Sequence, residues 1–377
     1  MRRSRIYFLW LDRQAPRRFR RGVSLHGHTM HSRESLAFLP RFARRIPLLK
    51  QAVAIQERNY RERHGRPLDY SRGWWTPPLP EREAFHLERQ QVESVLGLDA
   101  LISLTDHDGI DAALHLHLLE ESRGTPVSLE WTVPFGPSYL HLGIHNLPRA
   151  QSRSWAKGLA AYARRPAGAP LSELLAELSR LPEVLVVLNH PFWDEPGLGL
   201  AAHLALVERF LETHGSTIHA LELNGNRPWI ENKAVVQLAR ARQIPVVSGG
   251  DRHGSEPSVT VNLTNASTFD EFVREIREDG VSHILFLPRY REPFQLRLCE
   301  MVWDILRDYP ELTGRERWTD RVFFRTLAGS ELPLSRCWQG DGPGAVSASL
   351  AIIRLLGRGP VRLAVRQMLW QGNEMLP

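Results

Sequence analysis

The segment Gly22-Val-Ser-Leu-His-Gly-His-Thr29 sets a pattern that recurs along this chain. Its first half is short, continuous and apolar, which is typical of a strand buried on both faces. His26 and His28 follow at the end of that strand, and side chains at i and i+2 of an extended segment point to the same side. Because two imidazoles on one side can reach one metal ion, the segment predicts a buried strand that delivers metal ligands.

Apolar strands that end in polar residues recur between helical patterns. Further strands are predicted at 100–104, 184–188, 219–223 and 244–248, and closing elements at 259–263, 268–278 and 283–287. Helical patterns are predicted at 82–96, 171–181, 202–213 and 233–242. Strands that alternate with helices form parallel sheets or barrels, in which functional groups gather at the carboxyl ends of the strands. The sequence therefore predicts an α/β barrel with its site on that face.

Residue types that bind metal ions follow the expected strands. Besides His26 and His28, these are Asp106-His107, Glu130, His141, His190 and Asp251-Arg252-His253. A single pair of histidines is a weak signal, but five such motifs in the same position relative to their strands indicate one site. Imidazole and carboxylate ligands suit Zn, Mn or Fe.

The order of these motifs resembles the PHP (polymerase and histidinol phosphatase) family of metal-dependent phosphoesterases. That family shows HxH, TDH, a Glu, a His in an HxLG-like segment, His-Pro and a closing DxH, and the resemblance covers residues 20–290. It implies a distorted seven-stranded TIM-like (β/α) barrel. The expected activity is metal-dependent hydrolysis of phosphate esters, in which a hydroxide that bridges two metal ions attacks phosphorus.

The resemblance also implies ligand sets for two divalent metal ions, or three. The first set is His26, His28, Glu130 and Asp251. The second set is Glu130, His141 and His190, with Glu130 bridging the two ions. His107 and His253 would belong to a third site, or would orient the phosphate and protonate the leaving oxygen.

The chain departs from the family at Arg33, which stands where an Asp ligand of the third metal is usual. Either Glu34 or His31 replaces that ligand, or the Arg33 guanidinium takes over the electrostatic role against the phosphate. We favour the role for Arg33. Arg252, Arg227 and Asn224 are the other candidates for substrate binding.

Several histidines are expected to lie outside the metal site. His31 and His145 are predicted to be solvated or to support ligands, and His115 and His117 to be surface residues. Two regions are also expected to lie outside the barrel. These are a helical insertion at 34–80, which Trp74 and Trp75 would pack onto the barrel, and a helical C-terminal extension at 291–377.

Composition narrows the class of protein further. The 377 residues include 42% hydrophobic residues and a formal net charge of +6, which excludes a disordered chain. Two cysteines, no export signal and no apolar run of about 18 residues predict a cytoplasmic protein without a membrane span.

A phosphorylated small molecule is the expected substrate. Two alternatives stay open: a nuclease acting on oligonucleotides, which the basic balance allows, and a binding or scaffold module that has lost turnover. Oligomeric state stays open too.

Overall fold

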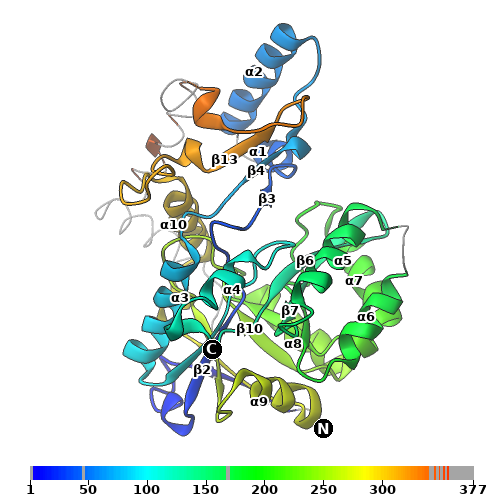
Figure 1. Cartoon of the computed structure of the whole chain (residues 1–377), viewed down its shortest axis with the longest axis vertical. Coiled ribbons are helices and arrows are strands. Elements are labelled where there is room, and N and C mark those ends of the chain that lie inside the picture. Colours follow the sequence, from blue (N-terminus) through cyan, green and yellow to red (C-terminus); the bar gives the residue numbers. More distant parts are fainter. Residues whose placement is uncertain are drawn as a thin grey trace.

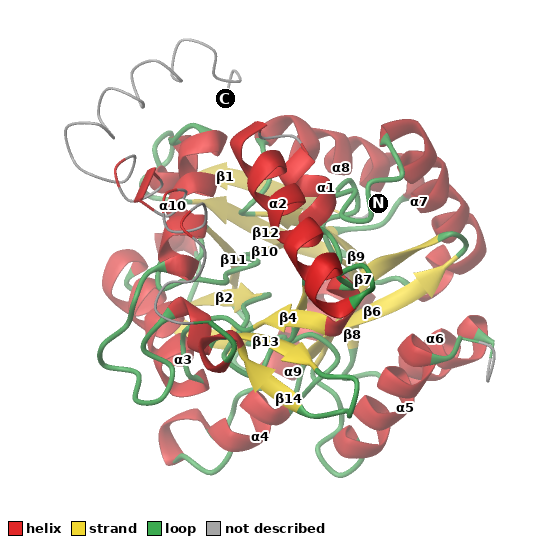
Figure 2. Ribbon diagram, turned by 90° about the horizontal axis from the view of Figure 1, so that it is seen from above, coloured by secondary structure: helices red, strands yellow, loops and turns green. Residues whose placement is uncertain are grey.

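The protein is a mixed α/β structure in which helices lie around the outside of strands (Figure 2). The computed structural model describes residues 3–44, 47–166 and 170–338, and positions 344, 348, 351, 352 and 355. The last part of the predicted C-terminal extension, apart from those single positions, lies outside the described residues. None of the described helices combines the length and apolar character needed to cross a bilayer.

One five-stranded sheet has the order β1-β12-β11-β2-β5. Its strands are β1 (Arg3–Phe8), β12 (Val281–Phe286), β11 (Thr260–Thr264), β2 (Arg21–Leu25) and β5 (Asp99–Ser103). The pairs β2/β5 and β1/β12 are parallel, whereas β11 is antiparallel to both of its neighbours. The expected boundary at residue 20 therefore leaves out β1, which belongs to this sheet.

A second five-stranded sheet has the order β10-β9-β8-β7-β6. Its strands are β10 (Val246–Gly249), β9 (Ala220–Asn224), β8 (Leu185–Leu188), β7 (Ser138–His145) and β6 (Leu129–Phe135). The first three are parallel, but β6 and β7 form an antiparallel hairpin and β7 is antiparallel to β8. Gly136, with a φ of 59°, supplies the left-handed conformation that this tight turn requires. Sequence reasoning missed this hairpin.

Two isolated bridges connect the sheets. His107 pairs with Glu130 between the end of β5 and β6, and Gly27 pairs with Arg252 between the segments that follow β2 and β10. In the described part of the chain these bridges do not extend into continuous ladders, so the two sheets do not close into one. The mixed α/β class is confirmed, and the closed seven-stranded barrel stays a prediction.

Helices form at the predicted ranges 82–96, 171–181, 202–213 and 233–242, and apolar side chains fill the space between them and the sheets. The α-helices from residue 81 to residue 274 are α3 (Glu81–Gln90), α4 (Asp111–Leu116), α5 (Ser152–Arg164), α6 (Leu171–Arg180), α7 (Leu200–His214), α8 (Trp229–Arg242) and α9 (Phe269–Arg274). Trp131, Phe210 and Leu221 are fully buried in the largest core cluster. Burial of this apolar surface holds the helices against the sheets.

The insertion and the extension were both predicted to be helical, but together they also form a separate four-stranded sheet. The insertion has the predicted helices α1 (Leu39–Arg44) and α2 (Pro47–His64), but it also contributes β3 (Glu34–Ser35) and β4 (Gly73–Trp75). The extension has α10 (Phe294–Leu306), followed by β13 (Val322–Arg325) and β14 (Glu331–Pro333). The order β14-β13-β4-β3 joins the two segments into one unit.

This small sheet and α2 lie above the two larger sheets (Figures 1 and 2). Trp74 stacks on Phe323 of β13, with ring centroids 5.7 Å apart. The Trp75 ring lies 5.5 Å from that of His253, in the segment after β10. Trp75 is thus one of the contacts between the insertion and the predicted ligands, as its apolar ring suggested.

Candidate metal centre

The predicted metal ligands converge on one place although they come from six segments of the chain. His26 and His28 follow β2, His107 follows β5, Glu130 lies on β6, His141 lies on β7, His190 follows β8, and Asp251 and His253 follow β10. The side chains are nearly all buried, and His107, Asp251 and His253 keep the largest exposure, at 13% each. The carboxyl ends of β2, β5, β8 and β10 bring four of these segments together, and the antiparallel hairpin of β6 and β7 adds Glu130 and His141.

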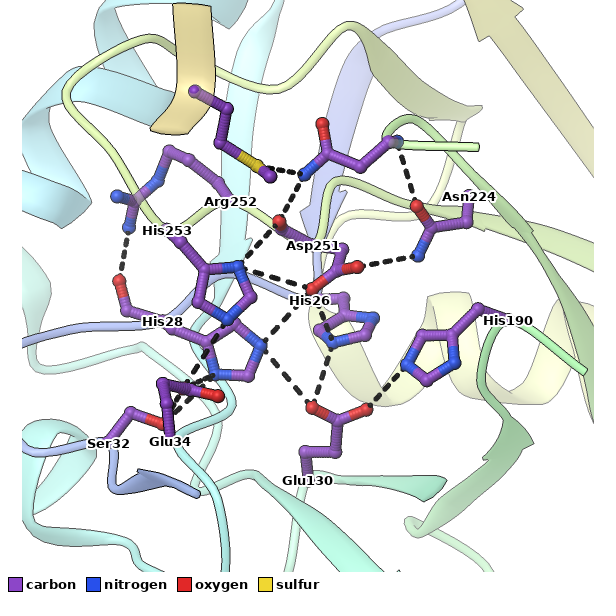
Figure 3. Close-up of polar contacts among 12 residues, drawn as sticks. His26, His28, Ser32, Glu34, Glu130, His190, Asn224, Asp251, Arg252 and His253 are labelled. Atoms are coloured by element: carbon purple, nitrogen blue, oxygen red, sulfur yellow. Dashed lines mark hydrogen bonds and ion pairs between the residues drawn. The ribbon is translucent and has the colours of Figure 1, made fainter. Parts of the chain in front are cut away.

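Glu130 contacts imidazoles on both of its carboxylate oxygens, and Figure 3 shows it joined to His26, His28 and His190. Its Oε2 atom is 3.1 Å from His26 Nε2 and 3.3 Å from His28 Nε2. Its Oε1 atom is 3.2 Å from His190 Nε2 and 3.6 Å from His141 Nδ1. One carboxylate therefore faces two pairs of imidazoles, as a bridging ligand does.

Asp251 faces the same pair of imidazoles from the other side. Its Oδ1 atom lies 3.7 Å from His26 Nε2 and 3.6 Å from His28 Nε2. Neither Nε2 atom has a hydrogen-bond partner among the described residues, although both are fully buried. Buried polar atoms without a partner are costly, and a cation between these two nitrogens and the two carboxylates would satisfy them. The donor set present fits a divalent metal ion.

A second group of side chains forms around Glu34, the first residue of β3. Its carboxylate lies 3.1 Å from His107 Nε2 and 3.4 Å from His253 Nε2. With His28 these residues offer ligand atoms that all lie within 4.8 Å of one another. Ser32 Oγ donates a hydrogen bond of 2.6 Å to Glu34 and accepts one of 3.0 Å from the His107 backbone.

Arg33 points away from this group, contrary to the role we favoured. Its side chain is 56% exposed and makes a two-pronged ion pair with Glu331 of β14, at 3.1 and 3.2 Å. Its guanidinium also lies over the Trp74 ring, 4.9 Å from the centroid. Successive residues of an extended segment point to opposite sides, so Glu34 faces inward when Arg33 faces outward.

Glu222 supports the ligands and was not assigned a role from the sequence. His26 Nδ1 donates to Glu222 Oε1 at 2.5 Å, and the His190 backbone donates to Oε2 at 2.8 Å. A carboxylate behind a ligand histidine fixes the ring orientation and directs Nε2 toward the metal position. Gly249 leaves room for this carboxylate, because a Cβ atom there would clash with Glu222.

Asn224, a predicted substrate ligand, is occupied by the same network. Its Nδ2 donates to Glu222 at 3.0 Å and to Asp251 Oδ2 at 3.4 Å, and its Oδ1 accepts from the Asn226 backbone. It is also completely buried. Asn224 thus positions acids of the cluster.

The backbone is strained at three of the clustered residues. His26, His190 and Asp251 have φ angles of 61°, 26° and 49°. Residues other than glycine rarely adopt a positive φ. Each such residue costs about 1–3 kcal/mol of folding free energy, so it persists only where the surrounding structure enforces it. These residues sit where strands end and the chain must turn sharply to direct a side chain inward.

The two remaining predicted arginines differ in their surroundings. Arg252 is buried and paired with an acid: its Nε lies 3.0 Å from a Glu88 carboxylate oxygen, and its terminal nitrogens donate to the backbone carbonyls of Gly254 and His28. Arg227 is also buried, but among the described residues its Nε has no hydrogen-bond partner and its guanidinium has no ion-pair partner. Its guanidinium lies over the Trp193 ring, 3.7 Å from the centroid.

Buried carboxylates keep most of the cluster's imidazoles protonated in the absence of metal. Burial opposes the charge on His26, but Glu130 and Glu222 outweigh it and raise its pKa well above the usual value. The imidazoles with a raised pKa are His26, His107, His190 and His253. His141 differs, because burial and the positive charges of His107 and His190 outweigh the effect of Glu130 and lower its pKa to about 3. His145 lies behind the cluster, where its Nδ1 is 2.8 Å from Ser103 Oγ.

The chain matches no family model and no curated protein. Its fold is similar to three solved structures at low identity. PsfC from Pseudomonas syringae PB-5123 is 18% identical, over 55% of this chain and 84% of that one, with a TM-score of 0.38. A protein from Bifidobacterium adolescentis described as a metal-dependent phosphoesterase is 17% identical, over 53% and 91%, with a TM-score of 0.36. An amidohydrolase from Chromobacterium violaceum, with bound sulfate and no metal, is 13% identical, over 61% and 87%, with a TM-score of 0.36. Similarity at this level leaves the family of the chain open.

The raised pKa values predict how the stability of the metal-free protein depends on pH. Protons held more tightly in the folded state stabilise it fully below about pH 6.5, the pKa of unfolded histidine. That stability is lost as the pH rises through the folded pKa values, by at most about 1.4 kcal/mol per pH unit for each group. Urea unfolding of chelator-treated protein at a series of pH values from 6.5 to 9 measures this loss in the free energy of unfolding. Added Zn²⁺ should restore stability at the upper end, because it replaces the protons. Stability that stays level or increases over this range would contradict the assignment.

Proposed function

We propose that the chain is a metal-dependent hydrolase of phosphate esters on a seven-stranded PHP-type barrel. The observation that carries the proposal is the position of Glu130 between His26 and His28 on one side and His141 and His190 on the other. His26, His28, Glu130 and Asp251 would hold one metal ion. Glu130, His141 and His190 would hold the second. Two ions sharing a carboxylate would lower the pKa of a water molecule and neutralise the charge of the phosphate.

Glu34, His107 and His253 would hold a third ion. This proposal of a third ion replaces the hypothesis that the Arg33 guanidinium acts on the phosphate instead of a third metal. The distances of 3.1 and 3.4 Å between the Glu34 carboxylate and the two imidazoles support it. The burial of Glu34 supports it too, since a buried carboxylate needs positive charge beside it.

Arg227 is the arginine best suited to bind the phosphate. A buried guanidinium is poorly hydrated and binds a phosphate oxygen strongly when one enters. The charges of Glu231, Asp251, Glu195 and Glu222 act on the Arg227 guanidinium, which supports a role beside the proposed metal ligands. The stack on Trp193 holds its plane in one orientation.

Activity should depend on Asp251 but not on an exposed aspartate. Metal-loaded Asp251→Asn is expected to lose more than about 100-fold in turnover of an aryl phosphate, beyond the cost of losing a group that only orients a ligand. Asp99→Asn, whose side chain is 73% exposed, is the matched control and should retain activity. Equal activities of the two variants would contradict the site.

A panel of monoesters, diesters and single-stranded oligonucleotides separates the alternative functions. Salt-sensitive shortening of oligonucleotides indicates a nuclease, and no turnover of any substrate indicates a binding module.

Metal content should depend on Glu34. Metal analysis of dialysed protein is expected to show one equivalent fewer in Glu34→Gln than in the unsubstituted protein, because the amide loses the charge that attracts the ion. Glu331→Gln, which removes the partner of Arg33, is the matched control and should keep all equivalents. Identical content in the two variants would exclude Glu34 as a ligand.

Arginine substitutions distinguish the two candidate phosphate ligands. Arg227→Lys should raise KM for the aryl phosphate about 10-fold to 100-fold, because lysine cannot make the two-pronged contact or the same stack. Arg33→Lys should change KM less than about 2-fold, since the side chain is bound to Glu331 at the surface. The reverse order of effects would return the phosphate role to Arg33.

A further inference from the structure

A group of three side chains outside the proposed centre also has the composition of a metal site. His31 Nε2 lies 2.9 Å from Glu81 Oε2, and His115 Nδ1 lies 3.0 Å from Glu81 Oε1. The residues belong to the segment after β2, to the first turn of α3 and to α4. We propose that His31, Glu81 and His115 bind a divalent transition metal ion such as Zn²⁺ at a second site. The inference does not depend on the proposed hydrolase activity.

The distances fit an ion with little rearrangement. The ligand atoms of the three side chains all lie within 4.8 Å of one another. A tetrahedral Zn²⁺ with bonds of about 2.0–2.1 Å separates its ligand atoms by about 3.4 Å. The two nitrogen-to-oxygen distances end on different oxygens of the Glu81 carboxylate, so either oxygen can face the ion, and each distance is only about 0.4 Å short of that separation. The rings of His31 and His115 are nearly perpendicular, with centroids 4.9 Å apart, so neither blocks the space between them.

The charge at this place favours a cation. Arg82, the neighbour of Glu81, is turned away and pairs with Glu121 at 3.1 Å, so among the described residues the ion-pair partners of Glu81 are the two imidazoles. Burial opposes the charge on Glu81, but the hydrogen bond from His31 lowers its pKa to about 2, so it is a carboxylate at neutral pH. Asp111 lies one helical turn before His115 on α4, on the same face, and water or this carboxylate would complete the coordination.

The position of the site suggests what the ion would do. His31 lies between His28 and the Ser32–Glu34 segment, whose side chains contact His107 and His253. The Met30 backbone already donates to Leu79, just before α3. A metal ion on His31, Glu81 and His115 would attach this segment to α3 and α4. It would therefore hold the Glu34 side of the larger centre in place.

Metal stoichiometry tests the site. Chelated full-length protein is dialysed against buffered low Zn²⁺ and analysed by atomic emission, and the same samples are titrated with Co²⁺ and followed by visible absorption. His115→Ala and Glu81→Gln are expected to bind one equivalent fewer than the unsubstituted protein. His86→Ala is the matched control, because His86 is exposed and pairs with Glu121 but has no second imidazole beside it. It should bind the full number.

The test of the second metal site can succeed or fail independently of the proposed hydrolase activity. His115 is half exposed, so its alanine variant is expected to fold, and its circular dichroism spectrum verifies this. In the Asp251→Asn background, which impairs the larger centre, His115→Ala should still remove one equivalent. Stoichiometry and Co²⁺ absorption identical in His115→Ala and the unsubstituted protein would overturn the inference, and would leave His31, Glu81 and His115 as a hydrogen-bonded group only.

Discussion

The negative charge of Glu130, held away from water, is the constraint around which this structure is organised. Only 1% of the residue is exposed, and an unpaired buried carboxylate would cost several kcal/mol. Imidazoles from four segments surround it, and the pKa values of His26, His107 and His190 are raised in the metal-free protein. Glycine is required opposite it on β7, because a Cβ atom at Gly143 would lie 2.8 Å from the Asn189 side chain that donates to Glu130. The packing of β6, β7 and β8 follows from this need.

The part of the cluster near Glu34 depends on segments far apart in the sequence. Glu34 pairs with Trp75 across β3 and β4, and Trp75 pairs with Val322 across β4 and β13. The inward position of Glu34 is therefore stabilised by a sheet that the C-terminal segment completes. Arg33, the residue before β3, points the other way and forms a surface ion pair with Glu331. Two adjacent charged residues thus face the buried cluster and the solvent respectively.

Much of the larger fold and many of the residues that converge in the cluster could be predicted, because both depend on local pattern. A continuous apolar run followed by histidine or aspartate is recognisable without any knowledge of the partner strand, and β2, β5, β8, β9 and β10 were found in this way. The hairpin of β6 and β7 was missed, although Glu130 and His141 on it were predicted ligands. The strands of the small sheet were missed because two to four residues carry too little periodicity to distinguish a strand from a loop.

The sequence by itself determined the alternation of strands and helices and the residue types at the strand ends, since both are properties of neighbouring residues. The tertiary structure alone decided that Glu34 and not Arg33 faces the histidines, that Arg252 pairs with Glu88 while Arg227 has no ion-pair partner among the described residues, and that Glu222 contacts His26. It also decided that His31 and His115 meet at Glu81. The physical reason is that the direction of a side chain at a strand end depends on the register and sharp turns of the backbone, which distant segments enforce.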